Sequence, residues 1–159
     1  LIENKIDGVL VLMGDPPANN KPLSPLFPSK VTDELVKNGY KENIEIYLSV
    51  PNNPDFKKIT KKISASPNGF VTQVIHNYEQ ADKIYNYLRP KGFDVIPCIL
   101  FPSNNNSKSA EFLKLDWSNY KENFTEYVNQ IHTLTNDILI TSPNDFKGAL
   151  DFFSSLNLD

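Results

Sequence analysis

Two apolar stretches, GFVTQVI at Gly69–Ile75 and FDVIPCIL at Phe93–Leu100, decide the fold class of this chain. Each is short, rich in β-branched residues and apolar almost throughout, as is typical of strands buried on both faces of a parallel sheet. The segment between them, Tyr78–Leu88, has the amphipathic spacing of a helix and follows Asn77, with Gln80 placed as in a capping box. This strand–helix–strand order predicts a parallel βαβ unit.

The same alternation continues in both directions along the chain. Three further apolar runs of similar length are Gly8–Met13, Ile44–Val50 and Asp137–Thr141. Further helices are predicted at 29–38, 55–64, 120–134 and 145–156, and Asn144, directly before the last of them, is its expected N-cap. Residues 1–159 are therefore predicted to form a single α/β domain with five parallel strands, each followed by helix.

Composition and charge limit the function classes. The chain has 159 residues, 40% of them apolar, and a net charge of −3, which gives no electrostatic argument for nucleic acid or a membrane surface as partner. No apolar run approaches the roughly 18 to 20 residues of a membrane-spanning helix, and no signal peptide is predicted. The single cysteine, Cys98, suits a reducing compartment, so the sequence predicts a cytoplasmic location.

The loops that follow the strands are where a binding site is expected, because ligands of parallel α/β folds bind at the C-terminal ends of the strands. The first of these loops, Gly14–Pro28, is long and rich in proline, which predicts a segment that covers a ligand. Within it, Asp15 would either project a carboxylate into the site or form part of a turn with Gly14. The polar tract Asn104–Ser107 is predicted to be exposed and mobile.

Two polar residues near the end of the third strand are further candidates. Gln73 could bind the edge of a heterocycle through its amide, which both donates and accepts, or it could simply begin a loop. His76 is expected to be a structural hydrogen-bonding residue more often than a catalyst. No second histidine or cysteine lies at metal-ligand spacing, so no metal site is predicted, and Cys98 is expected to be an inert core thiol.

Four lysines, Lys57, Lys58, Lys61 and Lys62, crowd the second predicted helix. Such a cluster usually forms a solvated face, whereas Lys62 together with Asp55 could instead flank a phosphate or a ribose. The common nucleotide-binding and hydrolase signatures are absent from the sequence.

Several motifs together resemble the methylenetetrahydrofolate reductase family. Val9–Pro17 is similar to the strand of that family that ends in Arg-Gly-Asp with prolines, and Ser49–Pro54 resembles its Tyr-Pro-Glu-x-His-Pro strand end. Asp55–Gln73 runs parallel to its motif Asp…Arg-Lys-Val-Asp-Ala-Gly…Ile-Thr-Gln, and Gly92–Pro97 resembles its Gly-Ile…Ile-Pro-Gly-Ile. Leu139–Leu156 resembles the last strand and helix, so that order and spacing agree over most of the chain.

The resemblance implies a (β/α)8 barrel, of which this chain would hold units four to eight. It implies hydride transfer from NADH or NADPH through FAD to 5,10-methylenetetrahydrofolate or a related pterin, in one-carbon metabolism and methionine biosynthesis. By the same resemblance Asp15 is the catalytic carboxylate, Gln73 contacts the folate head, and the cofactor lies against Gly14, Asp15, Asp55 and Lys62.

The chain also departs from the family pattern. Met13 replaces the arginine before Gly-Asp, and Val50 and the pair Asn52–Asn53 replace a tyrosine and a histidine. These replacements suggest the alternative of a non-catalytic paralogue that binds a pterin or flavin, or of a subunit in a one-carbon complex. A third hypothesis is an independent open sheet of the flavodoxin type, which a sequential strand order would reject.

The length of the chain bears on how the barrel would be completed. A (β/α)8 barrel needs about 250 residues, so five units cannot close one. The first residue, Leu1, is not methionine, which favours a longer natural chain. Free sheet edges pair readily with other strands, so the sequence predicts either a homo-oligomer or a second chain that completes the barrel.

Overall fold

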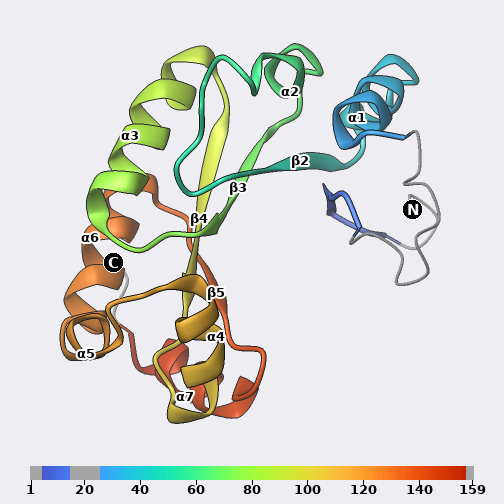
Figure 1. The fold of residues 1–159 in the computed structure, drawn as a ribbon. Coiled ribbons are helices and arrows are strands. Elements are labelled where there is room, and N and C mark those ends of the chain that lie inside the picture. The colour runs from blue at the N-terminus through green and yellow to red at the C-terminus, as the bar shows by residue number, and fades with distance from the viewer. Residues whose placement is uncertain (1–4, 15–25, 157–159) are drawn as a thin grey trace, which may run out of the picture.

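The computed structural model describes residues 5–14 and 26–156, and its centre is one sheet of five parallel strands in the order β1-β2-β3-β4-β5. The strands are β1 (Gly8–Val11), β2 (Glu45–Val50), β3 (Gly69–Val74), β4 (Asp94–Leu100) and β5 (Leu139–Thr141). The sheet curls into a half-barrel with helices against its outer side (Figure 1). The sequential order confirms the predicted parallel α/β class and rejects the flavodoxin-type sheet, whose strand order reverses.

Seven α-helices are described, and four of them differ from the sequence prediction: α2 is shorter, α4 was not predicted, and α5 and α6 replace one predicted helix. They are α1 (Pro28–Lys37), α2 (Thr60–Ser64), α3 (Tyr78–Leu88), α4 (Ser107–Leu113), α5 (Trp117–Glu122), α6 (Phe124–Thr135) and α7 (Phe146–Ser155). The prediction of one helix over 120–134 is wrong, because the helix is interrupted at Asn123, whose side-chain amide donates to the carbonyl of Asn119. Helix α2 is shorter than predicted, because a turn closed by Asp55 precedes it.

The core lies between the sheet and the helices. In β2 the alternate side chains Ile46, Leu48 and Val50 are fully buried against the helix layer, whereas Tyr47 and Ser49 point to the other face. Two apolar clusters fill this layer: one joins β2 and β3 to α2 and α3, and the other joins β3 and β4 to α5, α6 and α7. The outer face of the sheet is therefore covered and the inner, concave face is not.

The strand starts of β3 and β4 approach each other closely. A Cβ atom at Gly69 would lie 2.5 Å from the carbonyl oxygen of Asp94, so only glycine fits at this position. The predicted start of α3 is confirmed: the side chain of Asn77 accepts a hydrogen bond from the amide of Gln80 at 3.1 Å. The side chain of Gln80 accepts from the amide of His76 at 2.8 Å, so the two residues fix the chain as it leaves β3.

A β-bulge interrupts the pairing of β3 with β4. Val71 pairs with Ile96 and Val74 with Cys98, so two residues of β3 lie opposite the single residue Pro97. The amide of Asp94 donates to the carbonyl of Asn68, directly before β3. Because successive amides of a strand point to alternate sides, the nitrogen of Pro97 faces β5. Proline has no N–H to donate, and the ladder from β4 to β5 begins only after it, at Cys98.

Candidate functional site

The predicted site residues fall at or near the C-terminal ends of β1, β2 and β3. Gly14 follows β1 and is exposed, and Gln73 is exposed near the end of β3. Asp15, the predicted catalytic carboxylate, lies outside the described residues. Among the residues that the structure describes, no hydrogen bond or ion pair joins Gly14, Gln73, Asp55 or Lys62 to one another.

Gln73 lies within the β-bulge, which sets its direction. Its neighbour Thr72 is buried, and the hydroxyl of Thr72 accepts a hydrogen bond from the amide of Cys98 at 2.9 Å. In a regular ladder that amide would bind a backbone carbonyl of β3, so the Thr72 side chain replaces a main-chain partner. Bulges commonly redirect a side chain next to a site, and here Gln73 presents its amide to solvent.

Lys62 reaches back from α2 to the end of β2. Its ammonium donates to the carbonyl oxygen of Ser49 at 2.6 Å, and burial lowers the pKa of Lys62. The backbone groups of Glu45 face β1, so those of Ser49, four residues later on the same strand, face the same side. The last residue pair of β1 and β2 is Val11 with Leu48, so the carbonyl of Ser49 lies beyond the end of their ladder. Lys62 therefore completes the strand end in place of a backbone amide, while Lys57, Lys58 and Lys61 are exposed as predicted for a solvated face.

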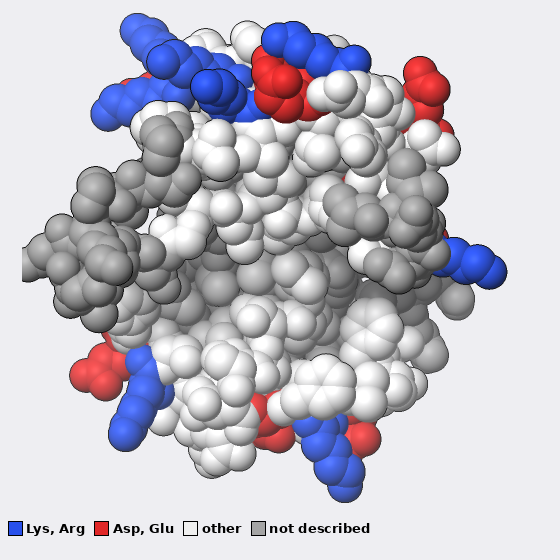
Figure 2. Space-filling view, turned by 90° about the vertical axis from the view of Figure 1, so that its right-hand side faces the viewer, with Lys and Arg blue, Asp and Glu red and all other residues white. Residues whose placement is uncertain are grey.

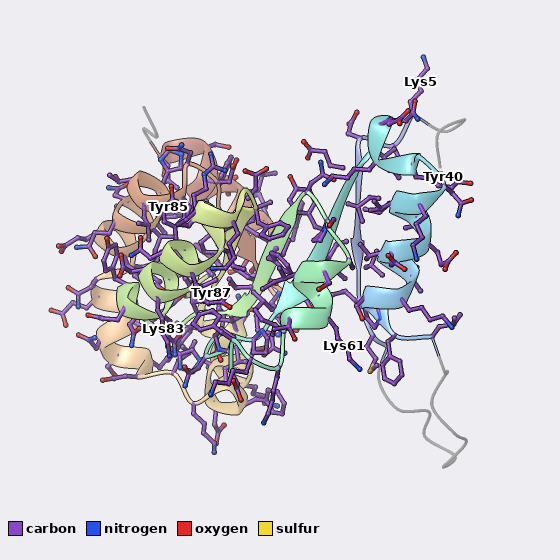
Figure 3. All side chains as sticks on the ribbon, turned by 90° about the horizontal axis from the view of Figure 1, so that it is seen from above. Lys5, Tyr40, Lys61, Lys83, Tyr85 and Tyr87 are labelled. Atoms are coloured by element: carbon purple, nitrogen blue, oxygen red, sulfur yellow. The ribbon has the colours of Figure 1, made fainter. Side chains whose placement is uncertain are left out.

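Asp55 is used locally. One carboxylate oxygen accepts from the amide of Lys57 at 3.0 Å, and the other lies 3.8 Å from the ammonium of Lys58. The loop that carries Asp55 is held against α3, because Phe56 stacks on Tyr87 with 3.8 Å between ring centroids and Lys83 donates to Asn53 at 3.2 Å. Figure 3, which looks from above, shows Lys83, Tyr85 and Tyr87 on α3 and Lys61 on α2.

His76 and Asn52 form a hydrogen-bonded pair between the ends of β3 and β2, which the sequence did not reveal. The side-chain nitrogen of Asn52 lies 3.0 Å from the carbonyl oxygen of Val74 and 3.2 Å from Nε2 of His76. An amide nitrogen only donates, so Nε2 accepts and the imidazole is neutral with its proton on Nδ1. Burial lowers the pKa of His76, which also favours the neutral imidazole. The prediction of a structural histidine agrees with this geometry.

A second polar network joins the loops after β4 and β5, and it corrects two predictions. Asn106 was predicted to be exposed, but it is fully buried. Its side-chain amide donates to the carbonyl of Phe101 at 3.0 Å and to Ser142 Oγ at 2.9 Å. The cap of α7 is not Asn144 but Asp145, whose carboxylate accepts from the amide of Gly148 at 3.1 Å and from the hydroxyl of Ser103. Asparagine-rich sequence looks like a loop, but here one asparagine bridges two strand ends.

A hollow of about 330 Å³ lies beside His76, between α3 and the helices α5 and α6. It is also lined by Tyr120 and Tyr127, whose hydroxyl pKa values are raised by burial, and by the exposed carboxylates of Glu79 and Glu126. Gln73 and Lys62 do not line this hollow, so it is separate from the predicted site.

The concave face of the sheet carries no charged side chain at its paired central positions. On this face the strand register pairs Leu10 of β1 with Tyr47 of β2. It also aligns Ser49 of β2, Val71 of β3 and Ile96 of β4 in one row across the sheet. Figure 2 shows the hollow of the half-barrel lined by uncharged side chains, with lysines and carboxylates near its margin. The single arginine is remote from the strand ends that carry the site, since Arg89 pairs with Asp94 at the start of β4.

Cys98 behaves as the sequence predicted. It is buried, with 8% of its surface exposed, and burial raises the pKa of its thiol to about 11. The thiol is thus protonated and unreactive at neutral pH. Among the described residues, no group of three histidine, cysteine or carboxylate side chains is placed to hold a metal ion.

No protein-family model matches this chain, and no curated protein sequence matches it. Within the part of the chain that the structure describes, no helix is long and apolar enough to cross a membrane.

Proposed function

We propose that this chain forms units four to eight of a barrel like that of the methylenetetrahydrofolate reductase family. In this proposal the completed barrel passes a hydride from NADH or NADPH, through FAD, to 5,10-methylenetetrahydrofolate or a related pterin in the cytoplasm. The observation that supports it best is the exposed amide of Gln73 at the bulge of β3, within a sequential parallel half-barrel whose concave face is uncharged at its central positions and carries Glu45 and Asp94 only at the strand starts, away from Gln73. A (β/α)8 barrel is built from this strand order.

The roles of the chain's own residues follow from their chemistry. Gln73 would orient the pterin, because one amide can accept from and donate to the same heterocycle edge. Asp15 would place a carboxylate beside the reacting ring, where it can bind a proton or stabilise a developing positive charge. FAD, when bound, supplies the hydride carrier between the nicotinamide and the pterin.

The residues proposed to hold FAD fit the cofactor only in part. Lys62 fits a phosphate-bearing ligand, since it is half-buried and uses one of its three N–H groups for the carbonyl of Ser49. Asp55 fits less well, because its carboxylate is engaged with Lys57 and Lys58 in the turn before α2. The described strand ends also offer no arginine for bidentate binding of a diphosphate.

The partial fit favours a second candidate function. In this alternative the chain is a divergent, non-catalytic protein that binds a pterin or flavin, or a subunit of a one-carbon complex. The specific observations are that Asp55 is engaged within its own turn and that Met13, Val50 and Asn52 stand where the family has charged and aromatic residues.

One experiment tests both functions. The natural reading frame that contains this chain is expressed, its flavin absorbance is recorded, and the reduction of 5,10-methylenetetrahydrofolate is measured with NADH and with NADPH. Binding of folate or flavin without reduction would favour the second function, whereas reduction of 5,10-methylenetetrahydrofolate with either donor would exclude it. If the protein binds neither folate nor flavin and reduces no folate with any donor, both proposals fail.

Gln73→Ala gives the residue-level test. Losing two hydrogen bonds of about 1 kcal/mol each should weaken pterin binding roughly thirtyfold. The matched control is Gln130→Ala, which removes an exposed glutamine amide from α6. Equal pterin affinity in both variants would remove Gln73 from the site.

A further inference from the structure

The two flanks of the half-barrel each present an apolar surface. On the β5 flank, α7 shows Phe146, Leu150 and Phe153 with 75%, 50% and 49% of their surfaces exposed. These residues follow the i, i+4, i+7 spacing of one helix face, here called the α7 stripe. A neighbouring face of the same helix, with Ala149 and Phe152, already packs on the core. The α7 helix is therefore apolar on two sides, as a helix between two neighbours would be.

The β1 flank has a hollow instead of a ridge. A groove of about 240 Å³, here called the α1 groove, runs along the outer side of α1, and Val31, Leu35 and Tyr40 line it. Its accessible surface is almost wholly apolar. Figure 3 shows Tyr40 beside α1, at the edge of the molecule opposite α3 and α6. A cavity of about 150 Å³ suffices for a benzene ring, so the groove has room for an aromatic side chain of the α7 stripe.

The sheet edges next to these two surfaces match each other. Among the described strands, β1 pairs only with β2 and β5 only with β4, so each has one side without a strand partner. They are opposite edges of one parallel sheet. A second copy turned about the axis of the curl therefore brings its β1 beside β5 in parallel orientation, and the same rotation brings its β5 beside β1. Helix α7 of each copy then lies beside α1 of the other.

We infer that the α7 stripe and the α1 groove form a head-to-tail interface between two copies of this chain, which closes two half-barrels into one ring of strands. One rotation covers both sheet edges and both apolar flanks. A partner that paired only through the α7 stripe would leave the α1 groove and the β1 edge open.

The area that such a pair would cover is in the range of stable complexes. Aromatic side chains bury roughly 150 to 250 Å² each, so one half-exposed stripe of three residues covers on the order of 300 Å². The groove contributes a similar area, and a twofold pair contains two such junctions, which gives about 1,200 Å² before any strand pairing is counted. Charge does not oppose the contact: Lys147 and Asp151 lie on α7, and Lys30 and Glu34 line the groove, so each side carries both signs.

The inference rests on the fold and not on the proposed function. Light scattering and sedimentation of the 159-residue chain should give a dimer at micromolar concentration. A monomer would overturn the inference and leave the proposed function standing, because the remaining units of the family barrel could then occupy the two edges. A dimer would show that a second copy occupies them, so that the chain is half of a ten-stranded ring instead of units four to eight of an eight-stranded barrel; whether that dimer binds folate then tests ligand binding separately. A larger open assembly would also contradict the closed pair, since head-to-tail contacts that do not close form filaments.

Substitutions test which surfaces meet. Phe146→Glu with Leu150→Glu, on α7, should weaken the dimer about 100-fold or more, because two exposed apolar anchors are lost. Leu35→Glu, in the α1 groove, should do the same, and Tyr40→Glu replaces it if circular dichroism shows that Leu35→Glu is unfolded. The control is Phe112→Glu on α4, an 85% exposed phenylalanine that belongs neither to the α7 stripe nor to the α1 groove. It should leave the dimer unchanged.

Mixing the two kinds of variant separates head-to-tail pairing from other arrangements. An α7 variant and an α1 variant can form a mixed pair with one native junction, whereas each variant alone has none. The mixed pair should therefore bind at least about tenfold more tightly than either variant with itself, as measured with differently tagged chains. A mixed pair that is no tighter, or an α1 variant that stays dimeric, would show that the α7 stripe meets another copy of itself or another surface.

Discussion

Removing the hydroxyl of Thr72 should destabilise the pairing of β3 with β4, because it removes a buried hydrogen bond between the two strands. Thr72→Val keeps the shape of the side chain but leaves the amide of Cys98 without its 2.9 Å acceptor in a buried position. An unsatisfied buried donor costs about 1 to 3 kcal/mol. For a chain of this size, a loss of about 2 kcal/mol lowers Tm by roughly 4 to 8 °C. We therefore expect a clear loss of stability from a nearly isosteric change.

Two measurements separate the hydrogen bond from packing. Thermal or urea unfolding followed by circular dichroism gives the free energy of unfolding, and hydrogen exchange gives the protection of single amides. In Thr72→Val the amide of Cys98 should exchange faster relative to that of Ile96, which lies two residues earlier on β4.

Thr72→Ser is the matched control because it keeps the hydroxyl and loses one methyl group. It costs packing energy of about 0.8 kcal/mol but should keep the Cys98 amide protected. If Thr72→Val unfolds at the wild-type midpoint and exchanges the Cys98 amide at the wild-type rate, the hydroxyl does not replace a ladder bond.

Three further outcomes are expected. Asn77→Ala removes the cap of α3 and should lower the free energy of unfolding by about 1 kcal/mol in urea titrations, whereas Asn77→Asp should retain most of it. Cys98, whose thiol pKa is about 11, should react with a maleimide at pH 7.5 far more slowly in the folded protein than in urea, and equal rates would contradict its burial. Burial lowers the pKa of His76, so as the pH falls the unfolded state binds a proton at this histidine before the folded state does. The free energy of unfolding should therefore decrease below about pH 6.5. In thermal unfolding measured against pH, His76→Gln should show a smaller decrease over this range.

The sequence predicted the parts of the fold that depend on local pattern. Continuous β-branched runs such as Phe93–Leu100 and the amphipathic segment Tyr78–Leu88 form strand and helix as expected, because each pattern suits only one kind of buried surface. The capping pair Asn77 and Gln80 also appears where its spacing indicated, since its geometry is set within four residues.

What the sequence could not show depends on contacts between distant segments. The burial of Asn106 requires the loop after β5 to supply Ser142, and the pairing of His76 with Asn52 requires β2 and β3 to end side by side. One signal was available: a proline within a central strand predicts a bulge or a missing ladder bond, and Pro97 lies opposite the bulge that carries Gln73.

The shortness of β5 has a consequence for motion. Pro97 delays the start of its ladder, so β5 is held to β4 by only three residue pairs, and α7 behind it is half-covered. Segments with few buried contacts and short ladders open first in the native state, on a free-energy scale well below global unfolding. The β5–α7 unit should therefore fluctuate most among the strand–helix units of the described chain. A molecule that binds to this flank therefore has to order the β5–α7 unit, which weakens its net affinity. Binding should also slow the hydrogen exchange of the amides in β5 and α7.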